Sequence, residues 1–338
     1  MFPVLRLPPL AFENIYKHWK VAEIIRLSQC SKCMRNIVKS MAKCGEKTLE
    51  VSVEKRYTFI QVFSKKKERL FAWRICLETM CKPENLSFVD QIFEGKSWRI
   101  AKSFYTPGWV SATQRDRLDQ DTLFVVQFFK DVFRCSIDKI ELRFRGNDKF
   151  DKLLQSTSIL HTAHYIRITM EDLSQEEMNF MLDNLVAEEL DIAGDGLFQY
   201  SYHKPVLRFP NISIGPAQWI TGADFMEMAE TCKKIHLYVG NNMTNQDLNT
   251  FTKAWLAGTN ETLETVNIYR EFSSVDPPAP REAMYANVIL NGIEGTRIND
   301  AHSQVKVEIK RADGKVANVI IQQGEARRAP SFSFTVVK

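Results

Sequence analysis

The stretch IHLYVGNNMTNQDL (Ile235–Leu248) contains the pattern that decides the fold. Its first part alternates apolar and other side chains, which is typical of a strand with one buried face, and Asn241-Asn242 then suits a turn. Thr244 stands three residues before Asp247, a spacing at which the hydroxyl can cap backbone N–H groups and the carboxylate can reach back. Apolar residues then follow at helical spacing: Leu248, Phe251 and Trp255. The stretch therefore predicts a strand, a turn and a capped amphipathic helix.

The same alternation recurs through the second half of the chain. Six segments carry it: KIELRF (139–144), YIRITM (165–170), ELDIAG (189–194), NISIG (211–215), KIHLYV (234–239) and TVNIYR (265–270). Two more helix start signals, Ser174 with Glu177 and Thr221 with Asp224, lie between them. Strand-plus-helix units of about 20–29 residues are typical of leucine-rich-repeat-like solenoids, whose stacked units bury faces that one unit cannot. The uneven spacing, 22 to 31 residues between first apolar positions, predicts an irregular version.

Other segments frame this repeat. Val305–Lys310 and Val316–Ile321 flank Asp313-Gly314, a pair suited to tight strand reversal, so they predict a hairpin at the end of the repeat. Asp276–Pro280 reads DPPAP and predicts a linker. Between the N-terminal segment and residue 138, Leu49–Glu54 predicts a strand, and the apolar run within 121–133 predicts a buried helix. We interpret the aromatic residues of this region as packing: Trp73, Trp98, Phe104 and Trp109.

The N-terminal segment predicts three short helices, at about 9–19, at about 22–29, and from Ser31 onward with that serine as N-cap. About forty residues are too few to bury a self-sufficient core, so these helices are expected to pack against something else. Cys30 and Cys33 form a C-x-x-C that could hold a metal, exchange disulfides, or supply two small buried side chains. Because no second pair at metal-ligand spacing accompanies them, we predict buried side chains along the face of Met34 and Ile37.

Composition and motifs exclude several classes of function. The net charge is +4, with 45 basic and 41 acidic residues, which is too balanced to predict nucleic-acid binding. No run approaches the roughly 18–20 apolar residues of a membrane span. Seven irregularly spaced cysteines and the lack of a signal-peptide pattern favour an intracellular protein, cytoplasmic or nuclear. Neither a catalytic motif nor a phosphate-binding glycine loop occurs, and the isolated pair His161 and His164 does not predict a metal site, so no enzyme activity and no cofactor are expected.

The N-terminal stretch FPVLRLPPLAFENIYKHWKVAEIIRLSQCSKCMRNIVKSM resembles an F-box, through Leu7-Pro8, the apolar residues of the first helix, Leu27-Ser28, and Cys30-Ser31-Lys32. Its C-S-K version resembles nematode F-box proteins that carry a C-terminal F-box-associated type 2 domain. Three later stretches match that domain: WITGADFMEM (219–228), CKKIHLYVGNNMTNQDLNTFTKAWLAGTNETLETVNI (232–268) and EIKRADGKVANV (308–319). The chain departs from the F-box pattern at Trp19-Lys20-Val21, where a weaker cap on the second helix is expected.

The resemblance implies an α/β protein with a small three-helix F-box followed by an irregular leucine-rich-repeat-like βα solenoid ending in a β-hairpin. The expected domains are an F-box at 1–45, a connecting α/β region at 46–137 that begins the solenoid, and an F-box-associated substrate-binding domain at 138–338. The implied function is that of a substrate-recognition subunit of a Skp–cullin–F-box ubiquitin ligase, which binds the Skp adaptor, through it a cullin, and an unidentified protein substrate. An alternative is a repeat-type interaction scaffold without a ubiquitin role, in which the N-terminal helices only cap the solenoid.

Candidate binding residues follow from this resemblance and from strand alternation. Apolar residues of the F-box are expected to serve either its core or the adaptor contact: Leu7, Pro8, Phe12, Ile15, Ile24, Leu27, Ile37 and Val38. Side chains on alternate positions of the strands are candidates for substrate contact: Arg143, Arg167, His236 and Asn267.

Overall fold

The computed structural model describes residues 8–43, 45–54, 56–81, 87–93, 95–103, 107–144, 160, 162–170, 175–194, 209–215, 217, 219–239, 242–270, 283–301, 303–324 and 329–337. The chain forms two compact units, residues 1–166 and 167–338. The division falls inside strand β8 (Thr162–Met170). The predicted linker at 276–280 and the predicted cap at Ser174 lie outside the described residues.

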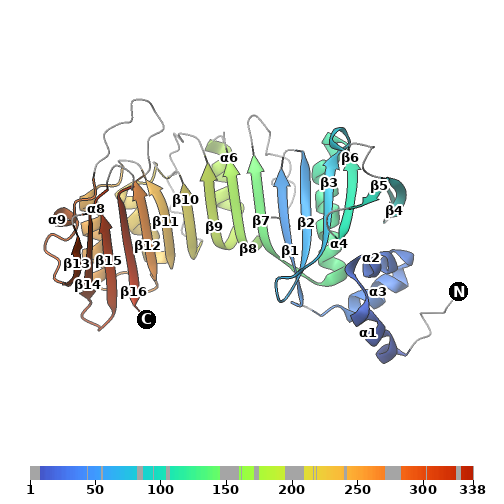
Figure 1. Cartoon of the computed structure of the whole chain (residues 1–338), viewed down its shortest axis with the longest axis horizontal. Helices are drawn as coiled ribbons and strands as arrows, with labels where there is room; N and C mark the ends of the chain where they lie inside the picture. The colour runs from blue at the N-terminus through green and yellow to red at the C-terminus, as the bar shows by residue number, and fades with distance from the viewer. Residues whose placement is uncertain are drawn as a thin grey trace. The chain divides into compact units, whose positions relative to one another are not determined.

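The first unit combines helices with a mixed sheet (Figure 1). Its helices are α1 (Pro9–His18), α2 (Val21–Cys30), α3 (Lys32–Met41) and α4 (Leu118–Phe133), with short 3-10 turns at Glu78–Met80 and Arg115–Arg117. Its strands are β1 (Lys47–Glu54), β2 (Tyr57–Ser64), β3 (Arg69–Leu77), β4 (Val89–Phe93), β5 (Lys96–Lys102), β6 (Gly108–Thr113) and β7 (Ser136–Phe144). They lie in the order β4-β5-β6-β3-β2-β1-β7, with parallel pairs at β3–β6 and β1–β7. The mixed α/β class and the helical N-terminus agree with the sequence prediction.

Helix α4 covers one face of this sheet and confirms the buried helix predicted within 121–133. Its buried side chains include Val125, Phe129 and Val132. Trp73 packs edge-on against Phe129 with ring centroids 6.0 Å apart, and its indole N–H donates to Ser111 Oγ at 3.0 Å. The predicted packing role of the aromatic residues is confirmed for Trp73, Trp98 and Trp109, which are all buried, while Phe104 lies outside the described residues.

The second unit begins with parallel strands connected by helices. Strands β9 (Val186–Gly194), β10 (Asn211–Gly215), β11 (Lys234–Val239) and β12 (Thr265–Arg270) pair in parallel in this order. Helix α6 (Gln175–Asn184) precedes β9, α7 (Gly222–Thr231) connects β10 to β11, and α8 (Asn245–Leu256) connects β11 to β12. The strand predictions are confirmed, and so is the capped helix after Ile235–Val239.

Both capping pairs that were predicted in the second unit and lie in described residues are formed in the same way. In α8, Asp247 N–H donates to Thr244 Oγ1 at 3.2 Å, and Thr244 N–H donates to Asp247 Oδ2 at 2.7 Å. Thr221 and Asp224 repeat this arrangement at the start of α7. The two helix starts also touch, because a Cβ added to Gly222 would lie 2.7 Å from Asp247 Oδ2 and closer to the rest of that carboxylate. Only glycine therefore fits the first turn of α7 without displacing the cap of α8.

The rest of the second unit is antiparallel. After the short helix α9 (Ala286–Ile289) come β13 (Thr296–Ala301), β14 (Gln304–Lys310), β15 (Val316–Gln322) and β16 (Ser331–Val337). The predicted hairpin is confirmed by the pairing of β14 with β15. However, the sheet continues past it, since β16 pairs with β15 on one side and with β12 on the other. The strand order is β9-β10-β11-β12-β16-β15-β14-β13.

Helices α7 and α8 bury their apolar sides against one face of this sheet, where Phe251 contacts Phe334 with ring centroids 5.2 Å apart. In the described residues no helix covers the other face, on the viewer's side of β9–β12 and β16 in Figure 1. We call this side the open face and define it by Ser213, Gly215, His236, Tyr238, Asn267 and Tyr269. Because strand side chains alternate, these residues project away from the buried set.

Candidate functional site

The N-terminal helices separate their apolar residues into a core and a surface. Phe12, Ile24 and Val38 are buried, and Leu27 and Ile37 are half-buried. Two further predicted residues are exposed: Pro8 and Ile15, the latter at 38%. Leu7 lies outside the described residues. A partner helix can therefore reach only part of the predicted set, namely the exposed and half-buried side chains.

Leu10 is an exposed apolar residue that the sequence prediction missed. Its side chain is 71% exposed on α1, whereas Phe12 and Tyr16 on the same helix are buried. The available signal was its position on the helix, out of phase with the buried residues Phe12 and Tyr16. Leu10 and Ile15 together leave α1 with exposed apolar side chains that a partner can contact.

The prediction that Cys30 and Cys33 are buried is wrong, since both thiols are exposed. The core positions of α3 are Met34 and Val38, one helical turn apart. Cys33 precedes Met34 and is rotated by about 100° from it around the helix, so it points away from the core. Cys30 is the last residue of α2, and its thiol donates to the Arg26 carbonyl at 3.4 Å.

The caps of α2 and α3 set the junctions between these helices. As predicted, Ser31 Oγ accepts from Met34 N–H at 3.1 Å. At Trp19-Lys20-Val21, where a weaker cap was expected, the Lys20 N–H donates to Glu23 Oε2 at 2.8 Å. A carboxylate in the first turn also suits the helix dipole. Glu23 thus supplies a cap that the side chain of Lys20 cannot.

Within the first unit, the N-terminal helices pack on α4 through α3. Lys39 forms an ion pair with Asp131 of α4, and the Arg35 guanidinium lies 6.0 Å from the centroid of the Phe128 ring. Beside this contact a cavity of about 880 Å³ lies between the helices and the sheet, with Tyr16 and Trp109 in its lining. Burial, and to a lesser extent Glu46, raises the pKa of Tyr16 to about 12, so its hydroxyl stays protonated at neutral pH.

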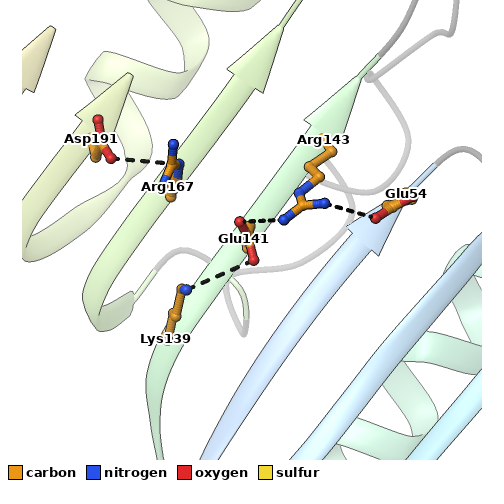
Figure 2. A network of polar contacts seen from close by, with 6 residues as sticks. All are labelled: Glu54, Lys139, Glu141, Arg143, Arg167 and Asp191. Carbon is orange, nitrogen blue, oxygen red and sulfur yellow. Dashed lines mark hydrogen bonds and ion pairs between the residues drawn. The ribbon is translucent and has the colours of Figure 1, made fainter. Parts of the chain in front are cut away.

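The predicted substrate residue Arg143 is already engaged in ion pairs (Figure 2). Its guanidinium donates to Glu141 at 2.9 Å and lies 3.4 Å from Glu54 on the neighbouring strand β1. Lys139 lies 3.8 Å from the other oxygen of Glu141. The Glu141 hydrogen bond raises the pKa of Arg143 above its ordinary value, so this charge is permanent. A ligand that bound here would compete with Glu141 and Glu54 for the guanidinium.

In the second unit, Arg167, His236 and Asn267 lie on one side of the sheet. Arg167 Nε lies 3.5 Å from Asp191 Oδ2 on β9 (Figure 2). Strand register places Asp191 beside Ser213 and Ser213 beside His236. His236 in turn lies beside Asn267, so the structure brings these two predicted residues together on adjacent strands.

Two tyrosines beside them were missed by the sequence prediction. Tyr238 and Tyr269 are register partners, and their rings stack at 5.1 Å with an interplanar angle of 21°. The His236 ring also lies 5.1 Å from Tyr269, at 25°. Tyr238 lies over Gly215, where an added Cβ would come within 2.9 Å of its Cδ2. In the sequence, His236 and Tyr238 are two residues apart, and so are Asn267 and Tyr269, which places each pair on one face of its strand. Only the register of the two strands shows that the pairs lie side by side.

The open face therefore presents three stacked rings between small polar side chains. Tyr238 is 38% exposed, and His236 and Tyr269 are half-buried. Burial lowers the pKa of His236 below 6.5, opposed by Asp191, so the imidazole is neutral at pH 7. Rigid aromatic rings with short polar neighbours suit protein recognition, because they give contact area at low entropic cost.

The described residues contain no group of three or more His, Cys, Asp or Glu side chains placed to hold a metal ion. No helix in the described ranges combines the length and apolar composition needed to cross a membrane.

Comparison with known families matches two parts of the chain. The chain carries an F-box domain at residues 4–44 and an F-box associated domain at residues 205–268. It is similar to the E3 ubiquitin-protein ligase hecw-1 of Caenorhabditis elegans, with 23% identity over 290 residues. That alignment covers 78% of this chain but only 22% of the relative, so the chain spans about a fifth of the relative's length. No solved structure matches the chain.

Proposed function

We propose that this chain is the substrate-recognition subunit of a Skp–cullin–F-box type ubiquitin ligase. In this proposal the F-box binds the Skp adaptor and through it a cullin, and the second unit holds a protein substrate. The observation that carries the proposal is the combination of an F-box domain with an F-box associated domain in one chain. The combination fits a non-catalytic adaptor, and the ubiquitin chemistry would belong to other subunits.

Exposed apolar side chains on the N-terminal helices support adaptor binding. Leu10 and Ile15 are left in water on α1, and Pro8 precedes them. Leu27 and Ile37 are only partly covered. We propose that the adaptor covers these residues together with Leu7, while Phe12, Ile24 and Val38 form the core beneath them. A well-buried Leu or Ile adds about 1.5–3 kcal/mol, so a few such contacts suffice for stable docking.

The open face supports the substrate-binding part of the proposal. The stacked rings, together with the adjacent residues His236 and Asn267 on neighbouring strands, form a surface that no described helix covers. We propose that substrate contacts this face, with Arg167 contributing where Asp191 allows. Separately, we propose Arg143 of the first unit as a substrate contact where Glu141 and Glu54 allow. The proposed substrate domain is residues 138–338, with residues 46–137 as its connecting α/β part and a leucine-rich-repeat-like stacking of its βα units. An intracellular location, cytoplasmic or nuclear, belongs to the same proposal.

A pull-down of the full chain with a purified Skp adaptor tests the first step. Wild type is expected to retain the adaptor, and the Leu7→Ala/Pro8→Ala double variant is expected to retain less. A matched control is Lys66→Ala, which removes an exposed side chain from the β2–β3 turn without touching the helices. A well-folded wild-type chain that retains no adaptor would overturn the proposal.

A repeat-type scaffold without a ubiquitin role is the second candidate, favoured by the packing of α3 on α4 through Lys39 and Asp131. Such a cap should cover the last strand of a sheet. The helices instead contact α4 and β3, and β3 is an interior strand with a cavity beside the contact. Deleting residues 1–45 separates the two functions: a scaffold that needs its cap unfolds, whereas a receptor stays folded and loses only the adaptor.

A further inference from the structure

Cys76 and Cys81 lie closer together than two unrelated thiols would. Cys76 is near the end of strand β3, and Cys81 follows the 3-10 turn at Glu78–Met80, which brings the chain back over the strand. Their sulfur atoms are 2.8 Å apart, and both thiols are free. Cys76 is buried, whereas Cys81 is half-buried. A reagent from solvent can therefore reach the pair through Cys81.

Two arginines, Arg74 and Arg99, lie near this pair. Arg74 lies two residues before Cys76 on β3, with its guanidinium 4.6 Å from the centroid of the Tyr57 ring. Arg99 of β5 shares the face of Cys76, because both are register partners of Ala112 on β6. A hydrogen bond from Cys76 lowers the pKa of Cys81, and Arg74 and Arg99 lower it further, against the opposing effect of burial. The thiolate is the nucleophilic form of cysteine, so these neighbours make Cys81 the more reactive partner.

The other thiols in the described ranges differ from this pair. Burial raises the pKa of Cys135 to about 12 and that of Cys232 to about 11, so both stay protonated. Cys30 and Cys33 are exposed, and the Cys30 thiol donates to the Arg26 carbonyl. Thiolate character and a resolving sulfur within contact distance are the two properties of redox-sensing cysteines. Cys81 and Cys76 supply them together.

We propose that Cys76 and Cys81 form a reversible intramolecular disulfide in response to a peroxide, independently of the F-box function. The Cys81 thiolate attacks the peroxide O–O bond, which yields a Cys81 sulfenic acid and releases hydroxide. The Cys76 sulfur then attacks the Cys81 sulfur and gives its proton to the departing hydroxide, which leaves as water. In sum, two thiols and one hydrogen peroxide give one disulfide and two waters, so the sulfurs lose two electrons and the peroxide gains them. A thiol reductant reverses the step by exchange.

The disulfide would fix the turn at Glu78–Cys81 to the end of β3. Close to the start of β4, the Arg99 guanidinium lies 5.2 Å from the ring centroid of Phe88. The cross-link closes a ring of only a few residues, so its effect is local rather than a large gain in global stability.

Peroxide titration of the full chain, followed by alkylation and mass spectrometry, tests the proposal. Trypsin releases residues 75–96 as one peptide that contains both cysteines, because Lys82 precedes proline. The expected result is a peptide that loses two hydrogen atoms and resists alkylation before Cys30 and Cys33 react, and that recovers with a thiol reductant. In C76S, Cys81 should stop at a sulfenic acid that a dimedone reagent captures, and in C81S, Cys76 should stay reduced. C232S is the matched control and should oxidise like wild type.

Two results would overturn the proposal. One is a wild-type peptide that remains fully alkylated after Cys30 and Cys33 are oxidised. The other is a Cys81 that proceeds to sulfinic acid while Cys76 stays free. Because both are measured on wild type, they decide the question even if a variant fails to fold.

Discussion

Replacing Gly222 with alanine tests whether the capped helix starts of the second unit depend on one another. The new methyl group would collide with the Asp247 carboxylate, which is held by the Thr244 N–H and hydroxyl at 2.7 Å each. This carboxylate can move only by leaving those bonds, so the substitution in α7 should damage the start of α8. Overpacking costs about 1–3 kcal/mol, and losing a cap costs about 1 kcal/mol. Against this, alanine gains up to about 1 kcal/mol in helix propensity.

We therefore expect Gly222→Ala to destabilise α8 by about 1–3 kcal/mol. Hydrogen exchange of the backbone amides in Asn245–Leu256 measures this locally, which avoids assuming that both units unfold together. Asp247→Ala alone should cost about 1 kcal/mol. In the Asp247→Ala background, Gly222→Ala should cost nothing or stabilise slightly, because its collision partner is gone.

Asp224→Ala serves as the matched control, since it removes an equivalent cap from α7 and leaves Asp247 in place. Its effect should appear in the amides of α7 rather than those of α8. If the effects of Gly222→Ala and Asp247→Ala on α8 simply add, the contact does not couple the helices and the reasoning is refuted.

Three further outcomes are expected. Leu10→Ala should leave the melting temperature unchanged and weaken adaptor binding roughly five- to thirty-fold, because about 1–2 kcal/mol of apolar burial is lost. Phe12→Ala should instead lower the melting temperature, because Phe12 is buried in the helical core. Calorimetry, which measures both melting and binding, separates the two effects. Burial lowers the pKa of His236 below its ordinary value of 6.5, so on acidification the unfolded state takes up the proton before the folded state does. The second unit should therefore lose stability as the pH falls below about 6.5. His236→Gln should flatten this dependence in melting curves taken at several pH values. Deleting residues 331–338 should unfold the second unit, seen as lost circular dichroism, because β16 joins β12 to β15.

Each of these has an outcome that would contradict it. Unchanged adaptor affinity in a folded Leu10→Ala chain would place the docking surface elsewhere. A stability curve for His236→Gln that still falls like wild type would assign the pH dependence to other groups. A cooperatively folded truncation would show that the antiparallel strands are dispensable.

Local patterns in the sequence predict the local features of this fold well. The Thr244–Asp247 spacing predicts its helix start because both partners lie within one turn. The placement of β16 between β12 and β15 could not be predicted in this way, since it depends on pairing across more than sixty residues of chain. The burial predicted for Cys30 and Cys33 was wrong because a ten-residue helix has fewer than three turns, so its apolar spacing defines the buried face only loosely.

The candidate site divides in the same manner. His236 and Asn267 follow from strand alternation alone, which identifies the face of a side chain but not its neighbours. Tyr238 and Tyr269 become a cluster only when the register of β11 against β12 is known. Leu10 needed the packing of α1 before its exposure could be seen.

The position of β16 also affects how the protein is made. During synthesis, β9 to β12 and the β14–β15 hairpin leave the ribosome before the strand that joins them. Until then β12 and β15 each present a row of unpaired backbone groups, which is a template for pairing with other chains. Long-range pairing of this kind is slow and prone to aggregation. Production of the folded protein should therefore depend strongly on chaperones and on growth temperature, and any stop codon before residue 331 should yield an insoluble product.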